Sequence, residues 1–225
     1  MNTPFIDPIV MQFLRDLAVN NNKEWFEANN DYYKRAKTKF EEGAKRFIDL
    51  VREIDPTIGS LEVKECTYRI YKDVRFSRDK SPYKINMGAF VVKDGKKSGN
   101  AGYYIHIEPD ACFFGGGLHC PEPSYLLGVR NEIFNNGDTF NTILTTSSFQ
   151  KAFNTIDAEA LKTAPKGFPK DYKYVDLLKF KSYTVGCKLT DEEPFTNDFE
   201  KRLTNYVKEI KPFVQYLNNA VKDVV

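Results

Sequence analysis

The chain has 225 residues, of which 41% are hydrophobic and 14% aromatic. It is therefore long enough to bury a core, and too rich in apolar rings for a disordered protein. Its 33 Lys and Arg residues nearly balance its 31 Asp and Glu residues, which excludes a protein whose overall charge attracts nucleic acid or anionic membranes.

The N-terminal sequence, MNTPFIDPIVMQFLRDL, lacks the basic segment, the apolar segment and the cleavage site of a signal peptide. The chain has no run of about 18 apolar residues that would span a membrane. Its four cysteines have no zinc-type spacing: Cys66, Cys112, Cys120 and Cys187. We therefore expect a cytoplasmic protein with free thiols and no membrane contact.

The first third of the chain predicts helices. Asp7 and Pro8 offer an N-cap followed by proline at the first helical position, and apolar residues at helical spacing come next. Asn20–Asn22 ends this helix. A further short helix is expected after it, and then a longer one whose apolar stripe ends before Pro56.

The centre of the chain predicts an antiparallel sheet, because β-branched and aromatic residues alternate there with turn signals. The short connections favour a meander, and one hairpin is expected to turn near Pro109 and Asp110. The expected strands lie near residues 66–76, 85–93, 102–108 and 112–119.

Helical patterning returns at residues 123–135, and a short helix after the loop Ala164–Lys173 leads into a strand that ends near Leu189. A last helix is expected from about residue 193 to residue 222. Helices, then strands, then helices indicate the α+β class. We predict one domain over residues 1–225, with N-terminal helices, a central antiparallel sheet of about four to six strands, and C-terminal helices packed on one face.

The stretch Arg69–Lys84, RIYKDVRFSRDKSPYK, carries six basic and two acidic residues, a net charge of +4. A strand over residues 68–76 would turn Tyr68, Ile70, Lys72, Val74 and Phe76 to the core, and Arg69, Tyr71, Asp73 and Arg75 outward. Guanidinium groups suit phosphate and carboxylate. We therefore predict that this surface binds an anionic small molecule. The predicted ligand-binding residues are Arg69, Asp73, Arg75, Arg78, Lys80, Lys84 and, from the later loop, Lys166.

Two other interpretations of this basic stretch stay open. The Arg and Asp side chains fit a structural or interaction protein with an ion-pair lattice, although ion pairs on exposed surfaces contribute little to stability. Tyr71, Phe76 and Tyr83 fit stacking on single-stranded nucleic acid, which the balanced net charge makes an unlikely partner.

Both histidines lie in Gly102–Pro121, GYYIHIEPDACFFGGGLHCP. His106 and Glu108 share one strand face and are candidates for acid–base catalysis, or for a structural hydrogen-bonded pair. With His119 they include metal-ligand types, but their spacing is not that of a metal site, and we predict no metal and no cofactor. His119 and Cys120 are expected on opposite faces, which disfavours a Cys–His nucleophile.

Taken together, these motifs resemble domain-of-unknown-function family 2461, a conserved hypothetical protein family of bacteria and fungi. The resemblance rests on RIYKDVRF…DKSPYK, GYYIHIEP, GGGLHCP and LKTAPKGFP…LLKFKSY, and it extends to about Leu189. The resemblance implies no activity, substrate or cofactor. The motif positions are Arg69, Asp73, Arg75, Phe76, Lys80, Pro82, Tyr83, Lys84, Gly117, Pro121, Arg130, Pro165, Lys166, Gly167, Leu178, Lys179 and Lys181.

The sequence leaves the oligomeric state and an enzymatic role open. The deciding observation is whether Arg69 and Arg75 converge with Lys84 and His106, because convergent groups make a site and splayed ones do not.

Overall fold

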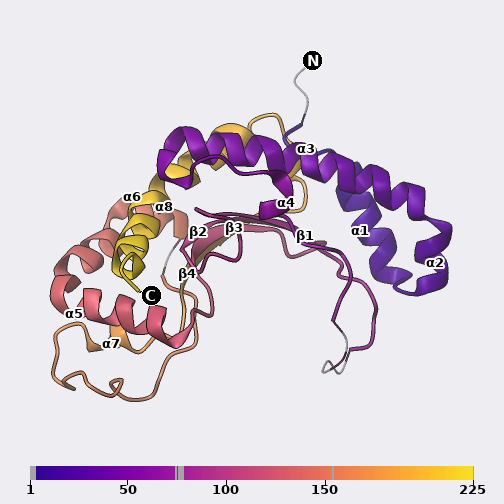
Figure 1. Ribbon diagram of the computed structural model, residues 1–225. Coiled ribbons are helices and arrows are strands. Elements are labelled where there is room, and N and C mark those ends of the chain that lie inside the picture. Colours follow the sequence, from indigo (N-terminus) through magenta and orange to yellow (C-terminus); the bar gives the residue numbers. More distant parts are fainter. Residues whose placement is uncertain (1–3, 74, 76–78, 154, 225) are drawn as a thin grey trace.

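A computed structural model describes residues 4–73, 75, 79–153 and 155–224 of the chain. Helices and strands follow one another in the predicted order, with the sheet in the middle (Figure 1). The elements are α1 (Ile9–Val19), α2 (Lys23–Ala28), α3 (Asn30–Ile54), η1 (Pro56–Ile58), α4 (Val63–Cys66), β1 (Met87–Val91), β2 (Gly102–Ile107), β3 (Phe113–Leu118), α5 (Pro123–Thr145), α6 (Ser147–Phe153), α7 (Val175–Leu178), β4 (Tyr183–Lys188), η2 (Glu193–Phe195) and α8 (Phe199–Val221).

The N-terminal helices begin and end where the sequence predicts. The Asp7 carboxylate accepts a hydrogen bond of 2.9 Å from the backbone N–H of Ile9, and Pro8 has helical angles, so the predicted cap is confirmed. Asn20 follows the last residue of α1, and α3 ends at Ile54, just before Pro56.

The four strands form one sheet in the order β1-β2-β3-β4, and every neighbouring pair is antiparallel. The β2–β3 connection turns where expected, and Asp110 has a φ of 61° there. Although α5, α6 and α7 separate β3 from β4 in the sequence, β4 returns to pair with β3 along its length. The prediction of an α+β protein with a central antiparallel sheet is confirmed.

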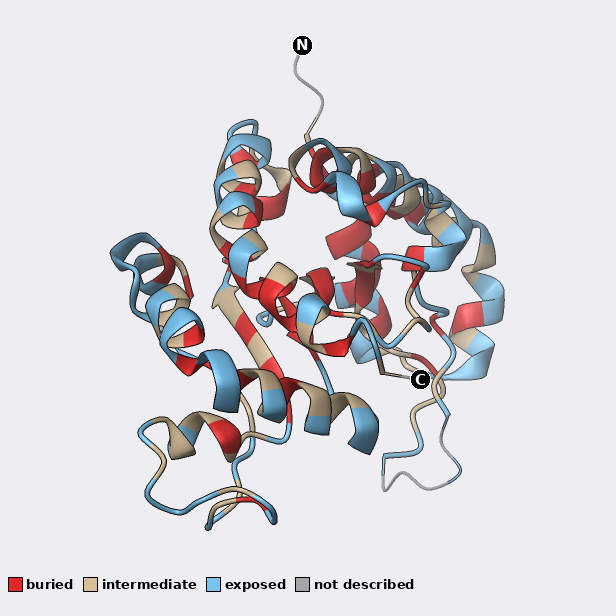
Figure 2. Cartoon of the chain, turned by 60° about the vertical axis from the view of Figure 1, so that its left-hand side comes forward, coloured by how far each residue is buried: buried red, intermediate tan, exposed pale blue. Residues whose placement is uncertain are grey.

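One face of the sheet carries the core. Phe114 of β3 is fully buried there between Phe47 of α3, at a ring-centroid distance of 6.2 Å, and Tyr206 of α8, at 5.8 Å. Both long helices therefore cover the same face (Figure 1). In Figure 2 the buried residues gather between these helices and the strands. None of the described helices crosses the opposite face, which we call the open face (Figure 1).

The predicted first strand, residues 66–76, is wrong. Helix α4 ends at Cys66, and the described residues after it form only two isolated bridges, Thr67 with Ala89 and Tyr71 with Tyr83. The reason is that the backbone pairs with itself instead of with β1: the N–H of Lys72 donates to the Pro82 carbonyl at 2.9 Å, and that of Lys84 to Ile70 at 2.8 Å.

The described residues between 70 and 84 therefore form a projecting arm, which Figure 1 shows beside the open face. Ile70 is buried as predicted, whereas Tyr68, also expected to face the core, is 48% exposed. Val74 and Phe76, the other two apolar residues of the expected core face, lie outside the described residues.

The helices after the third strand also differ from the prediction, in two boundaries and in one additional helix. Helix α5 continues to Thr145 through a kink at Asn136, where φ is −127°. Helix α6 was not expected, and α8 begins only at Phe199, after the short η2 turn. Within the described part of the chain, no helix is long and apolar enough to cross a membrane.

Candidate functional site

The arm is held at its base by one asparagine and one aromatic stack. The Asn21 side chain donates to the Tyr83 carbonyl at 2.9 Å and accepts from the Tyr83 N–H at 3.1 Å. The Tyr83 ring stacks on Phe26 with centroids 3.9 Å apart. These contacts tie the arm to the start of α2, so its basic residues have a defined place next to the sheet.

Within the arm, much of the predicted positive surface is neutralised by nearby carboxylates. Arg75 donates two side-chain hydrogen bonds to Asp73, at 3.0 and 2.7 Å, and Lys72 pairs with Asp79. These bonds lower the pKa of both carboxyl groups. Lys80 is exposed in the arm.

Two further lysines, Lys84 and Lys96, lie against one tyrosine ring at the edge of β1. Lys84 Nζ lies 5.7 Å from the centroid of the Tyr68 ring, and Lys96 Nζ lies 5.9 Å from it. Burial lowers the pKa of Lys84, and the positive charge of nearby Arg69 lowers it further. Lys84 and Lys96 at the Tyr68 ring, together with Arg69 near Lys84, form what we call the basic corner.

The basic corner differs from the arm in having no acidic partner. Among the residues that the structure describes, no carboxylate lies within ion-pair distance of Arg69, Lys84 or Lys96. Lys96 Nζ donates instead to the backbone carbonyl of Lys64, at 2.5 Å. The corner therefore presents positive charge that no ion pair among the described residues neutralises. Arg69 nevertheless acts on Asp73: after the hydrogen bonds from Arg75, its charge helps to lower the pKa of that carboxyl group.

The register of the strands connects this corner to the open face. The bridge between Thr67 and Ala89 sets Tyr68 beside Gly88, and Gly88 is paired with His106 on β2. Residues directly opposite each other in antiparallel strands share a face. Tyr68 and His106 consequently lie on the same side of the sheet, in one row with Gly88.

Next to the corner, three side chains on the open face form a hydrogen-bonded chain that we call the relay. Tyr104 Oη lies 2.8 Å from His106 Nδ1, and His106 Nε2 lies 2.6 Å from Glu108 Oε2. The His106 side chain is 12% exposed and stacks on Phe113, with ring centroids 4.8 Å apart. An ionised Glu108 accepts from Nε2–H, which leaves Nδ1 to accept the Tyr104 proton.

Gly88 makes room for the relay. A Cβ atom at this position would lie 2.8 Å from Cζ of Tyr104, so the tyrosine ring occupies the space that any other residue would fill. Burial raises the pKa of Tyr104, and the neighbouring Tyr68 raises it further. Tyr104 therefore stays protonated at neutral pH.

Sequence reasoning paired His106 with Glu108 but missed Tyr104, Tyr68 and Lys96. The signal for Tyr104 was present, because it stands two residues before His106 and therefore on the same face of a strand. Tyr68 was assigned to the wrong face together with the strand that does not form, and Lys96 comes from a separate turn after β1.

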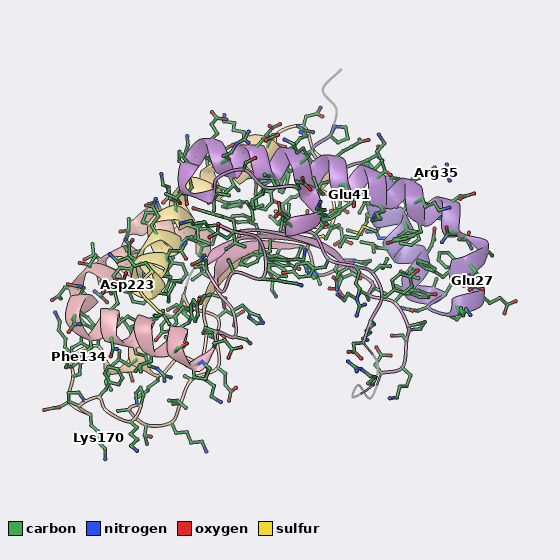
Figure 3. The ribbon with its side chains drawn as sticks, in the orientation of Figure 1. Glu27, Arg35, Glu41, Phe134, Lys170 and Asp223 are labelled. Carbon is green, nitrogen blue, oxygen red and sulfur yellow. The ribbon has the colours of Figure 1, made fainter. Side chains whose placement is uncertain are left out.

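Other predicted residues lie away from this site. Lys166 belongs to the loop between α6 and α7, which lies beside α5 and far from the arm in Figure 1, and Lys170 of the same loop points outward in Figure 3. Arg78 lies outside the described residues. Of the three predicted arginines, only Arg69 is shown to lie with Lys84.

His119 and Cys120 follow the far end of β3, and the expectation that they point to opposite faces is wrong. The strand ends at Leu118, and Cys120 has a φ of 45°. This turn brings Cys120 Sγ to 3.4 Å from His119 Nε2. Among the described residues, no group of three or more His, Cys, Asp or Glu side chains is arranged to hold a metal ion.

Arg130, one of the motif residues, has a structural place. Its Nε donates to the Leu178 carbonyl at 2.8 Å and its Nη2 to the Phe180 carbonyl at 3.2 Å. It thereby joins α5 to the segment that enters β4.

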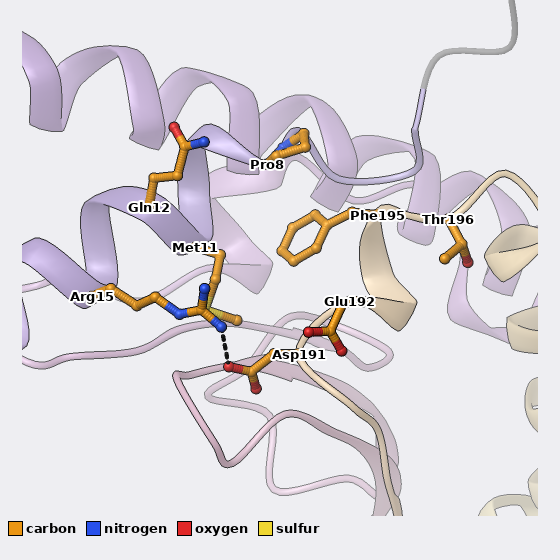
Figure 4. A pocket seen from close by; sticks show the side chains of 8 residues that line it. All are labelled: Pro8, Met11, Gln12, Arg15, Asp191, Glu192, Phe195 and Thr196. Carbon is orange, nitrogen blue, oxygen red and sulfur yellow. Dashed lines mark hydrogen bonds and ion pairs between the residues drawn. The ribbon is translucent and has the colours of Figure 1, made fainter.

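A groove of about 360 Å³ lies between α1 and η2, away from the arm (Figure 4). Arg15, the basic residue of its lining, is already paired with Asp191 at 2.8 Å, and Asp191 also accepts from the backbone N–H of Asp110 at 2.9 Å. The groove therefore offers no positive charge comparable to that of the basic corner.

Comparison with protein families gives one match. The family model described as "Conserved hypothetical protein (DUF2461)" matches residues 9–216, which is most of the chain. Neither a curated protein nor a solved structure matches the chain significantly.

Proposed function

The chain belongs to the DUF2461 family of conserved hypothetical proteins, and we propose from the geometry of its site that it binds a small anionic molecule at the basic corner. The ligand class is one that carries a phosphate or a carboxylate. The binding residues are Arg69 and Lys84 at the base of the arm and Lys96 from the turn after β1.

One observation carries this proposal: the cations of the basic corner lie close together with no carboxylate at ion-pair distance among the described residues, while Lys72 and Arg75 in the adjacent arm are paired with aspartates. Burial, and after it repulsion by the positive charge of Arg69, lowers the pKa of Lys84. A bound anion would remove the repulsion and accept charge-assisted hydrogen bonds. The partial burial of Lys84 strengthens such bonds relative to those on an open surface.

The test is calorimetric titration of the protein with inorganic phosphate, sulfate and a panel of carboxylates and sugar phosphates. We expect at least one anion to bind to the parent protein and to raise its melting temperature by mass action. In an Arg69→Ala/Lys84→Ala variant the affinity should fall by about tenfold or more, because one charge-assisted hydrogen bond contributes about 1.5–3 kcal/mol.

Lys151→Ala is the matched control, since it removes an exposed positive charge from α6, which packs on the opposite face of the sheet. It should bind the same anion as tightly as the parent. Equal losses in both variants, or no binding by the parent protein, would contradict the proposal.

A second candidate function is contact with single-stranded nucleic acid. It is favoured by the exposure of Tyr68 and Tyr71, at 48% and 51%, beside basic residues. Mixed oligonucleotides titrated at about 50 mM salt test it, since such binding weakens steeply as salt rises. Oligonucleotide binding that is much tighter than phosphate binding, and that Tyr68→Ala and Tyr71→Ala abolish, would replace the small-molecule proposal.

A further inference from the structure

We propose that the relay extends the basic corner into a larger binding site, in which Tyr104 accepts a hydrogen bond from a hydroxyl group of the bound anion. The ligand class is a small hydroxyl-bearing carboxylate or phosphate ester. This inference rests on the proposed function, because the basic corner must first hold the anionic group.

The direction of the hydrogen bonds selects a hydroxyl group. Tyr104 has a single hydroxyl proton, and the 2.8 Å contact directs it to His106 Nδ1. Its oxygen is then left as an acceptor, so a ligand group that contacts it must be a donor. A carbonyl or ether oxygen in that place would face an oxygen with no proton to offer.

Tyr104 lies close enough to the basic corner for one ligand to contact both. Tyr104 lies over Gly88, and Tyr68, whose ring Lys84 and Lys96 approach, lies beside the same glycine. Tyr68 is also near enough to Tyr104 to affect its ionisation. One small molecule can therefore place its anionic group among the lysines and its hydroxyl at Tyr104.

A merely structural relay would leave ligand preference untouched, and matched ligand pairs distinguish the two roles. The probes are lactate against propionate, and glycerol 3-phosphate against propyl phosphate, each pair differing in hydroxyl groups. We expect the parent protein to bind the hydroxyl-bearing member about two- to tenfold more tightly, the range for one neutral hydrogen bond. Tyr104→Phe should lose this preference while binding propionate and propyl phosphate as the parent does.

Gly88→Ala provides a second variant that keeps the Tyr104 hydroxyl. The added methyl group must displace the Tyr104 ring, because it would lie 2.8 Å from Cζ. The preference for hydroxyl-bearing ligands should fall in this variant too.

Histidine nitrogen NMR reports on the relay, since the chain has only two histidines and His119→Asn assigns the other signal. In the parent, glycerol 3-phosphate should change the His106 Nδ1 chemical shift more than propyl phosphate does, because a hydroxyl group that donates to Tyr104 strengthens the Tyr104–His106 hydrogen bond.

The outcomes separate the two proposals. If none of the four anions binds to the parent protein, the anion site itself fails. If anions bind but the hydroxyl gives no advantage, or if the advantage survives in Tyr104→Phe, the anion site stands and the relay has no role in recognition. If the advantage is present but the His106 signals do not respond, the hydroxyl group is recognised elsewhere than at Tyr104.

Discussion

Tyr103 and Tyr104 are neighbours in β2, yet their hydroxyl groups serve opposite faces of the sheet. Tyr103 is fully buried under the helices and donates to Asp55 at 2.7 Å, where Thr57 also donates to the carboxylate at 2.7 Å. Tyr104 lies on the open face and donates to His106. The alternation of side chains along the strand therefore places Tyr103 in the core and Tyr104 in the proposed binding site.

Tyr103→Phe should lower the free energy of unfolding by about 1–3 kcal/mol, because the buried Asp55 carboxylate loses a donor and water cannot replace it. Urea unfolding of the parent and the variant measures this difference. The control is Tyr32→Phe, whose hydroxyl bonds to Asp16 at the surface at 3.2 Å. The control should change stability by less than about 0.5 kcal/mol, and an equal loss in both variants would contradict the account.

At the scale of elements, the arm shows why a strand-like sequence does not become a strand. The N–H groups of Lys72 and Lys84 donate to the carbonyls of Pro82 and Ile70, so these backbone groups are not available to extend the sheet beyond β1. The acidic residues between them are the partners of the basic ones: Asp79 accepts from Lys72 and from the N–H and hydroxyl of Ser81. These bonds close the arm on itself.

The arm should consequently be sensitive to acid. The Lys72 ammonium group, followed by the Ser81 hydrogen bonds, holds the pKa of Asp79 below its ordinary value of 3.8. A group with a lowered folded-state pKa contributes stability that is present above 3.8 and is lost as the pH falls through the folded-state pKa. Carboxyl-carbon NMR should therefore show Asp79 titrating below 3.8.

Lys72→Ala should move the pKa of Asp79 upward, toward 3.8, because it removes the largest cause of the shift. The Ser81 amide signal should report the opening of the arm at a correspondingly higher pH. A titration of Asp79 that is the same in the parent and in Lys72→Ala would show that the ammonium group is not the cause.

For the whole molecule, the sheet joins two groups of helices into one body. Phe114 contacts α3 through Phe47 and α8 through Tyr206, so helices from opposite ends of the chain pack on one strand. Figure 2 shows a single zone of buried residues in this region. We propose on this basis that residues 1–225 form one cooperative domain.

Equilibrium unfolding tests this proposal with two local probes. The chain has a single tryptophan, Trp25 in α2, and a Trp25→Phe/Phe134→Trp variant moves the probe to α5, where Phe134 packs against Tyr172 at a centroid distance of 5.0 Å. Both fluorescence transitions should coincide with the loss of helical circular dichroism in the same protein. A separate transition at either tryptophan would indicate two units.

By itself, the sequence determined the elements whose patterns are local and strong. The caps of α1, the apolar stripes of α3 and α8, and the hairpin at Asp110 follow from spacing and from turn residues, which act within a few positions of the chain. The same alternation placed His106 and Glu108 on one face. The motifs also pointed to the family that the match over residues 9–216 confirms.

Only the tertiary structure decided which charges are available to a ligand. The stretch 69–84 has a net charge of +4, but the fold pairs Arg75 and Lys72 with aspartates and leaves Arg69 and Lys84 to meet Lys96 around Tyr68. Lys166 belongs to the loop between α6 and α7, which Figure 1 shows at the other end of the sheet from the arm. Charge is a property of residues, whereas uncompensated charge depends on which partners the folded chain brings within reach.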